Sequence, residues 1–498
     1  MQNNVELWFA ILAFVLTGAA LASGVVDRIP LSLPIVFLAL GLLLGPGALG
    51  IIQLTPHDPA LIAVATLNLA LVLFLDAARF DVDELKREWR VPLLDLGPGT
   101  FLTIAGVALA AALLFHTNAL QSILIGAVLA STDPIILRDV VRDQHIPRSV
   151  RRTLTIEAGT NDIIVLPIVL IAIEISLASP GRGIGHWLGF LAELLVLSPL
   201  AGLVVGGAGA WLMGKADARY SIRREFQALY GIGLVLAAYS AAQALGGDGF
   251  LAAFFAGLAV ALFDVTLCDC FMDYGEVTAE MAMLLAFVLF GAVLGPLFGT
   301  IPFGLALVFA LIAILVVRPA ALTLALGVLH AHMSRDARLF IAWFGPRGLS
   351  ALLLALLAVE AGVPDAEGLL AVVGVVVLVS ALAHGVTATP AARWYGERVA
   401  HAHAAPEEER ESGAAGLFQG EAGAAAVPRV SPEELRAWLA GPSPPIVLDV
   451  RTRGQYAEAD GQIPGSVRVA PDQVREWAAR VSAEHPAERD RLVVAYCT

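Results

Sequence analysis

The sequence predicts an all-α polytopic membrane protein of about 13 transmembrane helices, followed by a small α/β unit at the C-terminus. Three observations support this prediction. Hydrophobic residues make up 58% of the 498 positions and charged residues only 15%, whereas soluble domains carry about 25% charged residues. Apolar runs of about 20 residues, long enough to cross a bilayer, recur up to residue 392. Past residue 400 the composition becomes that of a soluble chain.

The expected helices are separated by short loops. The first run follows Met1 without a basic residue, unlike the positively charged start of a signal peptide, so we expect it to remain as a membrane helix. The runs lie near residues 5–24, 31–52, 60–78, 91–115, 119–141, 151–177, 186–213, 224–245, 248–268, 277–297, 302–329, 336–360 and 367–392.

The distribution of basic residues predicts the orientation. Loops after odd-numbered runs hold basic clusters, such as 86–90, 138–152 and 215–224, whereas the other loops hold Arg182 alone. Because cytoplasmic loops carry the excess of Lys and Arg, we expect a multi-pass protein of the cell inner membrane with its N-terminus outside and its C-terminus in the cytoplasm. The acidic loop 264–276 is the one exception.

Charge and cysteine content exclude other classes of protein. The net charge of −13 argues against a nucleic-acid partner, so the expected macromolecular surroundings are the lipid bilayer. Cys268, Cys270 and Cys497 are too few and too scattered for a disulfide framework. We expect no cofactor and no metal site.

The first polar interruption of an apolar run is Thr132-Asp133-Pro134 in the fifth expected helix. Proline removes a backbone donor and moves the preceding residue away from helical geometry. The run is therefore expected to be two half-helices with an unwound centre, where free backbone groups can serve an ion. The alternative is a simple kink with a solvated Asp133.

The sixth expected helix carries two acids, Glu157 and Asp162. A charge inside a bilayer is costly, so such residues are functional candidates. At 100° per residue, Asn161 lies near the face of Glu157, while Asp162 points elsewhere. We expect Asp162 to bind the ion and proton beside Asp133, and Glu157 to form a buried ion pair. The alternative places both acids in a wet vestibule.

A second break, Phe344-Gly345-Pro346-Arg347-Gly348, interrupts the twelfth expected helix. The fifth and twelfth helices cross the membrane in opposite directions, as two crossed discontinuous helices of an inverted repeat require. Arg347 stays charged and needs an anion, for which Glu157 is the expected partner. Arg318 is a second buried base, or one that reaches the interface. Asp76 either reaches the same cavity or caps its helix.

Taken together, these motifs resemble the monovalent cation:proton antiporter family, in its electroneutral sodium/proton exchanger branch. The resemblance covers residues 1–400 and implies that Asp162 is the main ion-binding carboxylate, with Thr132 and Asp133 beside it. It further implies that Asn161 holds the Glu157–Arg347 pair and that Arg318 belongs to the same network. Electrogenic relatives have two aspartates where this chain has Asn161-Asp162, so electroneutral exchange is expected.

The expected partners are Na⁺, with K⁺ or Li⁺ as alternatives, H⁺, and a second copy of the chain in a homodimer. Relatives often have a hydroxyl residue where Ala158 stands, which leaves the choice between sodium and potassium open. A cation channel or uniporter, and a transporter of another solute on the same fold, are the alternative functions.

Beyond the membrane domain, residues 401–428 are rich in Ala, Gly and Glu and are expected to form a flexible linker. Residues 429–498 resemble a rhodanese-like domain through Val447–Arg451, Gly461–Ser466 and Val493–Cys497. Cys497 falls where that family has its persulfide cysteine. Since the chain stops at Thr498 and Gln462 replaces the usual histidine, we expect a truncated and inactive domain, with a membrane-tethered sulfurtransferase as the alternative.

Overall fold

The structure is a computed structural model that forms two compact units, Met1–Gly413 and Ala414–Thr498. It describes residues 32–79, 94–133, 146–179, 182–262, 269–328, 334–401, 432–441, 444–450, 462–469 and 492–496, together with a few isolated positions.

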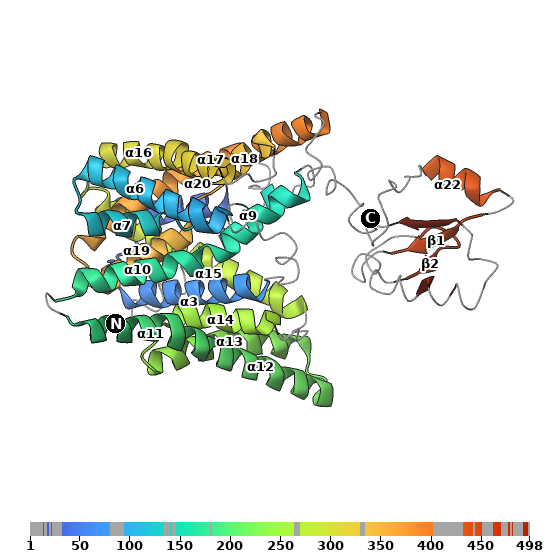
Figure 1. The fold of residues 1–498 in the computed structure, drawn as a ribbon, viewed down its shortest axis with the longest axis horizontal. Helices are drawn as coiled ribbons and strands as arrows, with labels where there is room; N and C mark the ends of the chain where they lie inside the picture. Colours follow the sequence, from blue (N-terminus) through green and yellow to red (C-terminus); the bar gives the residue numbers. More distant parts are fainter. Residues whose placement is uncertain are drawn as a thin grey trace. The chain divides into compact units, whose positions relative to one another are not determined.

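The first unit is a bundle of helices that run side by side along one common direction (Figure 1). Three π-helical turns, η1 (Asp95–Gly99), η2 (Glu193–Leu197) and η3 (Ala313–Val317), lead directly into α6, α12 and α17. The helices described are α2 (Leu33–Leu44), α3 (Pro59–Ala78), α6 (Thr100–Phe115), α7 (Ala119–Val128), α9 (Arg148–Thr160), α10 (Asp162–Leu177), α11 (Ile184–Ala192), α12 (Ser198–Tyr220), α13 (Arg224–Ala244), α14 (Gly249–Leu262), α15 (Asp269–Leu297), α16 (Phe303–Ile312), α17 (Arg318–Val328), α18 (Arg335–Trp343), α19 (Leu349–Glu360) and α20 (Ala366–His401).

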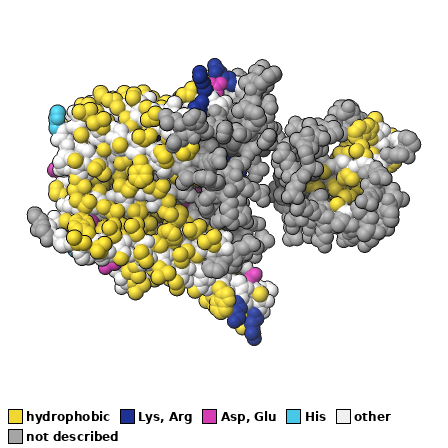
Figure 2. Space-filling view, viewed as in Figure 1, with side chains coloured by type: hydrophobic (Ala, Val, Ile, Leu, Met, Phe, Trp, Pro, Cys, Tyr) yellow, Lys and Arg dark blue, Asp and Glu magenta, His cyan; other side chains and the backbone are white. Residues whose placement is uncertain are grey.

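The predicted polytopic membrane fold is confirmed. Among the described residues, 7 helical stretches are long and apolar enough to cross a membrane, and α2, α7, α14 and α19 are shorter apolar helices. Hydrophobic side chains cover much of the part of this unit that Figure 2 draws in colour. A soluble protein rarely exposes so continuous an apolar surface. The first predicted helix, 5–24, lies almost wholly outside the described residues.

Small residues let several helices approach closely, as is usual between membrane helices. A Cβ on Gly41 of α2 would overlap the backbone of Val288 in α15. Gly202 and Gly206 of α12 lie in the same way against the backbone of α14, at Ala252 and Ala256. Glycine is therefore required at these positions because any side chain would force the helices apart.

The last helix of the unit extends beyond its predicted end at residue 392. α20 continues through Pro390 to His401. Tyr395 is fully buried and stacks on Phe340 of α18, with ring centroids 4.7 Å apart. Arg398 then forms an ion pair with Asp336 at 3.2 Å. These contacts with α18 explain why the helix continues past a residue that removes one of its hydrogen bonds.

The second unit contains a helix and a small parallel sheet. Helix α22 (Pro432–Leu439) is followed by β1 (Ile446–Asp449), β2 (Val467–Arg468) and β3 (Val493–Tyr496), in the order β2-β1-β3. The Tyr496 hydroxyl donates to Asp449 Oδ2 at 2.9 Å and ties β3 to β1. The predicted linker 401–428 lies almost entirely outside the described residues.

Candidate functional site

Two helix breaks meet inside the first unit. α7 ends at Val128 and is followed by an unwound segment that reaches Asp133, while residues 344–348 separate α18 from α19. The two breaks touch directly, because the Asp133 backbone N–H donates to the Pro346 carbonyl at 2.9 Å. The predicted breaks are therefore confirmed at Asp133 and at residues 344–348, whereas most of the expected second half of the fifth helix lies outside the described residues.

Each break contributes one charged side chain that interacts with a helix end at the other break. Asp133 accepts a hydrogen bond from the Leu349 N–H at 2.8 Å, so its carboxylate lies at the N-terminus of α19. A Cβ on Gly348 would overlap this carboxylate, which explains the glycine. In return, Arg347 donates to the carbonyls of Ala130 and Ser131, at 2.5 and 2.8 Å, just beyond the C-terminus of α7. Anions favour helix N-termini and cations favour C-termini, so both placements are stabilising.

Asp162 begins α10 and lies beside the same unwound segment. Its side chain is only 6% exposed. The Ser131 hydroxyl donates to Asp162 Oδ1 at 2.6 Å, and the Ser350 hydroxyl, from the first turn of α19, interacts with the same carboxylate. Among the described residues, no Lys, Arg or His forms an ion pair with Asp162. This carboxylate therefore has hydroxyl neighbours and no fixed counter-charge.

Asn161 does not hold the Glu157–Arg347 pair that the sequence predicted. Its amide nitrogen donates instead to the Ala130 carbonyl at 2.8 Å and to Thr132 Oγ1 at 3.3 Å. The amide thus fixes the unwound end of α7. Its carbonyl oxygen Oδ1 is buried and has no hydrogen-bond partner among the described atoms. A buried acceptor without a donor is unusual and fits an oxygen that faces an ion or a water molecule.

The ion pair of Glu157 also differs from the prediction. Glu157 Oε1 lies 2.6 Å from Arg318 Nη2, and both side chains are at most 4% exposed. Arg318 also donates to the Phe344 carbonyl at 3.1 Å, beyond the last residue of α18. Among the described residues, Glu157 thus forms its ion pair with Arg318 and not with the expected Arg347, whose guanidinium bonds to carbonyl oxygens. The alternative in which the Arg318 side chain reaches the membrane interface is wrong, because the side chain is buried.

The wide π-helical turn η3 lies just before this arginine. The Arg318 N–H bonds to the Ala313 carbonyl, five residues back, instead of the residue four back. Such a turn accommodates Pro319, whose ring would clash with the carbonyl four residues before it. A π turn also rotates the residues that follow it relative to a regular helix. Arg318 is buried in the bundle, and the helix expected over residues 302–329 gave no indication of this turn.

Asp76 lies near the end of α3 and faces the site. A Cβ on Gly159 of α9 would lie 3.6 Å from Asp76 Cβ, so the two helices meet at this point. Asp76 is close enough to interact electrostatically with both Asp162 and Asp133. These contacts favour the cavity-facing role over the alternative of a helix cap.

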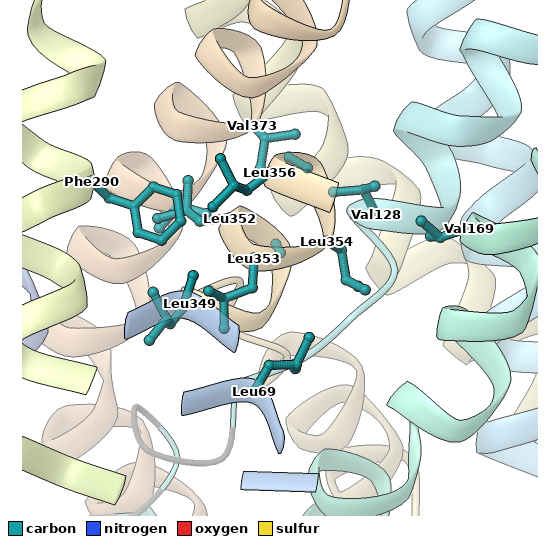
Figure 3. Packing of buried hydrophobic residues seen from close by; sticks show 14 of the residues in the cluster. Leu69, Val128, Val169, Phe290, Leu349, Leu352, Leu353, Leu354, Leu356 and Val373 are labelled. Atoms are coloured by element: carbon teal, nitrogen blue, oxygen red, sulfur yellow. The ribbon is translucent and has the colours of Figure 1, made fainter. Parts of the chain in front are cut away.

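Apolar side chains pack around the α19 side of the breaks. Figure 3 shows Leu349, Leu352 and Leu354 of α19 among side chains from neighbouring helices, including Val128 of α7 and Phe290 of α15. None of these five side chains is more than 3% exposed. The core of the bundle beside the breaks is therefore apolar on this side.

Sequence reasoning missed four polar residues around the breaks. Ser131 and Ser350 contact Asp162, and Ser380 and His384 of α20 bond to the second break. Ser131 could have been found, because it directly precedes the Thr132-Asp133 motif. His384 also carried a signal, since it is an ionisable residue inside a long apolar run.

Comparison with known proteins agrees with this geometry. Residues 12–394 match the family described as sodium/hydrogen exchanger, transmembrane. The chain belongs to this family. The K⁺/H⁺ antiporter NhaP2 of Shewanella baltica strain OS223 is 30% identical over 404 residues, which cover 78% of this chain and 67% of that protein. The K⁺/H⁺ antiporter NhaP of Alkalimonas amylolytica is 26% identical over 401 residues, covering 79% and 67%.

A solved exchanger structure shares the fold. The sodium proton antiporter MjNhaP1 from Methanocaldococcus jannaschii at pH 8 superposes with a TM-score of 0.63 and 20% identity, covering 82% of this exchanger and 99% of that chain. The C-terminal unit of this exchanger is a rhodanese-like domain, matched over residues 431–498. Cys497, the predicted persulfide position, lies outside the described residues.

Proposed function

We propose that this exchanger moves a monovalent cation against a proton, by alternating access at Asp162. The observation that carries the proposal is that Asp162 differs from the other buried charged groups in the partners that it contacts. Glu157 is paired with Arg318, Asp133 is held by a backbone amide, and Arg347 is held by carbonyls. Asp162 alone of these groups receives only hydroxyl donors among the described contacts. It is therefore the carboxylate that can take up either a proton or a cation.

The oxygens around Asp162 supply the remaining coordination. Ser131 Oγ, Thr132 Oγ1 and the free Asn161 Oδ1 lie on the elements that surround the carboxylate, and Asp76 contributes a second carboxyl group nearby. Hard cations prefer such oxygen ligands. When a proton occupies Asp162, the site loses the charge that attracts the cation, so the two bind in competition.

Exchange then requires the loaded site to change its exposure. We infer that the apolar packing beside α19 (Figure 3) closes one side of the site. Movement of the helices that carry the breaks against the rest of the bundle would open that side and close the other, as in transporters with broken helices. A channel would instead need an open path on both sides at once.

Everted membrane vesicles provide the direct test. Addition of the transported cation to vesicles with an acid interior is expected to dissipate the proton gradient. The fluorescence of a quenched pH-sensitive dye then recovers. We expect responses to Na⁺ and also to K⁺, since the relatives from Shewanella and Alkalimonas are named K⁺/H⁺ antiporters and Ala158 offers no hydroxyl ligand. A response in vesicles that lack the protein, or none with Na⁺, K⁺ or Li⁺, would contradict the proposal.

The exchange is proposed to be electroneutral. Asn161 beside Asp162 is neutral, and in this proposal Asp162 is the one carboxylate that gives up its proton, so one proton leaves for each monovalent cation that binds. Proteoliposomes clamped at different potentials with K⁺ and valinomycin are expected to exchange Na⁺ for H⁺ at the same initial rate. A rate that increases steadily with membrane potential would show that net charge crosses the membrane.

The arrangement in the membrane is proposed from the sequence pattern. We propose an inner-membrane protein with its N-terminus outside, its C-terminus in the cytoplasm, and two copies in contact. The long stretch Ile184–Tyr220 supports the dimer, because only 22% of its apolar window is buried within one chain. Native mass spectrometry from lipid nanodiscs tests the dimer, and labelling of single cysteines from each side tests the orientation.

The rhodanese-like unit is proposed to be uncoupled from exchange and inactive as a sulfurtransferase. The exchanger match ends at residue 394 and the two units are separately compact; Gln462 stands where the rhodanese family usually has histidine. Deletion of residues 404–498 is therefore expected to leave the rate of exchange unchanged. Loss of exchange in a correctly folded deletion variant would make the unit regulatory. Thiocyanate formation from thiosulfate and cyanide that disappears in Cys497→Ser would show that it is catalytic.

A further inference from the structure

Helix α20 presents two buried polar side chains to the second helix break. Ser380 and His384 are four residues apart and so lie on one face of the helix. They are 0% and 2% exposed, within a helix whose neighbouring side chains are largely apolar. Neither residue belongs to the cation site described above. Buried polar groups are kept where they make hydrogen bonds, and their partners identify what the two residues do.

Both partners are backbone groups at the edges of the break. The Arg347 N–H donates to Ser380 Oγ at 2.7 Å, two residues before α19 begins. His384 Nε2 lies 3.0 Å from the carbonyl of Trp343, the last residue of α18. A carbonyl only accepts, so this contact is a hydrogen bond in the tautomer that carries the proton on Nε2. In the other tautomer the proton lies on Nδ1, which is 2.8 Å from the Ser380 carbonyl of the same helix. The Trp343 indole also donates to Thr387 Oγ1 at 3.1 Å. One helix face thus holds both ends of the break.

The segment between these two attachment points contacts the site. It contains Pro346, whose carbonyl accepts from the Asp133 N–H, and Arg347, whose guanidinium holds the Ser131 carbonyl. The hydroxyl of that same serine donates to Asp162. A continuous series of contacts therefore runs from α20, through the second break and the first, to the ion-binding carboxylate.

We propose that Ser380 and His384 are positioning residues that fix the width of the α18–α19 break and thereby the affinity of the site for its cation. They act through Arg347 and Trp343 and do not touch the ion. The proposal rests on the proposed exchange at Asp162 for its functional consequence, whereas its structural part, the attachment of the break to α20, stands independently.

Three substitutions of His384 distinguish the contribution of Nε2 from that of Nδ1. In His384→Gln the amide nitrogen can occupy the position of Nε2 and donate to Trp343. In His384→Asn the amide nitrogen reaches only the position of Nδ1, which lies 2.8 Å from the carbonyl of Ser380 on the same helix. His384→Leu keeps a side chain of similar size but has no hydrogen-bond donor.

A serine substitution tests the other attachment point. Ser380→Ala removes the acceptor of the Arg347 N–H. Ser176→Ala is the matched control, since among the described residues that hydroxyl bonds to Ala172 in its own helix.

The first measurement is cation-dependent exchange over a range of cation concentrations. Ser380→Ala, His384→Leu and His384→Asn are expected to raise KM for the cation by about tenfold, the range expected for one lost buried hydrogen bond, with a smaller change in the maximal rate. His384→Gln and Ser176→Ala are expected to behave as wild type. An unchanged KM in Ser380→Ala and His384→Leu, or rescue by asparagine and not by glutamine, would overturn the proposal.

The second measurement does not depend on transport. Hydrogen–deuterium exchange of the backbone amides at residues 345–349, in detergent, is expected to become faster in Ser380→Ala and His384→Leu and to stay at the wild-type rate in His384→Gln. Faster exchange throughout the bundle in those two variants would indicate general destabilisation and would overturn the positioning role. If the wild-type protein exchanges no cation, the proposed function fails, while these amides still report whether α20 holds the break.

Discussion

Asp162→Asn is expected to reduce cation-dependent proton release to the level of vesicles without the protein. The cation would then enter a buried site without the charge that balances its own. Loss of one partner of a buried charge pair costs about 3–5 kcal/mol, and each 1.4 kcal/mol is about a factor of ten. The rate at a fixed cation concentration should therefore fall by at least about a hundredfold.

The variant is expected to fold, which makes the result informative. Asparagine has nearly the shape of aspartate, and its amide oxygen can still accept the hydrogen bond from Ser131. Ser131→Ala provides the matched control, because it removes one neutral ligand and keeps the charge. We expect that variant to exchange with a higher KM. Exchange at the wild-type rate in Asp162→Asn would exclude the single-carboxylate mechanism.

The two breaks were predictable from the sequence because in each of them a proline stands next to a charged residue inside an apolar run. Thr132-Asp133-Pro134 and Gly345-Pro346-Arg347 each stand inside a run that is otherwise apolar, and no continuous helix can pass through them without losing hydrogen bonds. The structure places both breaks where the sequence did and joins them by the Asp133–Pro346 hydrogen bond.

The partners of the buried charges were harder to predict, because they depend on the direction of side chains. Opposite charge alone allowed Glu157 to pair with either arginine. Helix C-termini expose carbonyl groups that compete with carboxylates for a guanidinium, and the unwound end of α7 takes Arg347 in this way. The π turn before Arg318 then directs that residue toward Glu157. A π turn has no sequence signature comparable to proline.

Tertiary contacts also explain the errors in the helix ends. Sequence periodicity ended the last helix near residue 392, where the hydrophobic run stops. The structure continues it to His401 because Tyr395 and Arg398 find partners on α18. Ser380 and His384 were missed for a related reason: their importance comes from the backbone groups that they meet, and those lie more than 30 residues away in the sequence.

The buried pair of Glu157 and Arg318 gives the second large expected effect. Arg318→Ala leaves the Glu157 carboxylate buried without its cation, which should destabilise the fold by about 3–5 kcal/mol. The thermal midpoint in detergent should fall clearly. Adding Glu157→Ala removes the uncompensated charge, so the double variant should recover at least half of the loss, since replacing both partners of a buried pair is often nearly neutral.

Arg347→Ala is the matched control for this pair, because Arg347 and Arg318 are the same residue type and are both 4% exposed. Arg347 holds the Ala130 and Ser131 carbonyls and not Glu157. Its loss should also lower the thermal midpoint, but adding Glu157→Ala should restore nothing, because no carboxylate was left unpaired. If Glu157→Ala raises the thermal midpoint of Arg347→Ala and not that of Arg318→Ala, Glu157 pairs with Arg347 instead. If it raises the midpoint of Arg318→Ala alone, the ion pair joins α9 and α17, and Arg347 stabilises the contact between the two helix breaks.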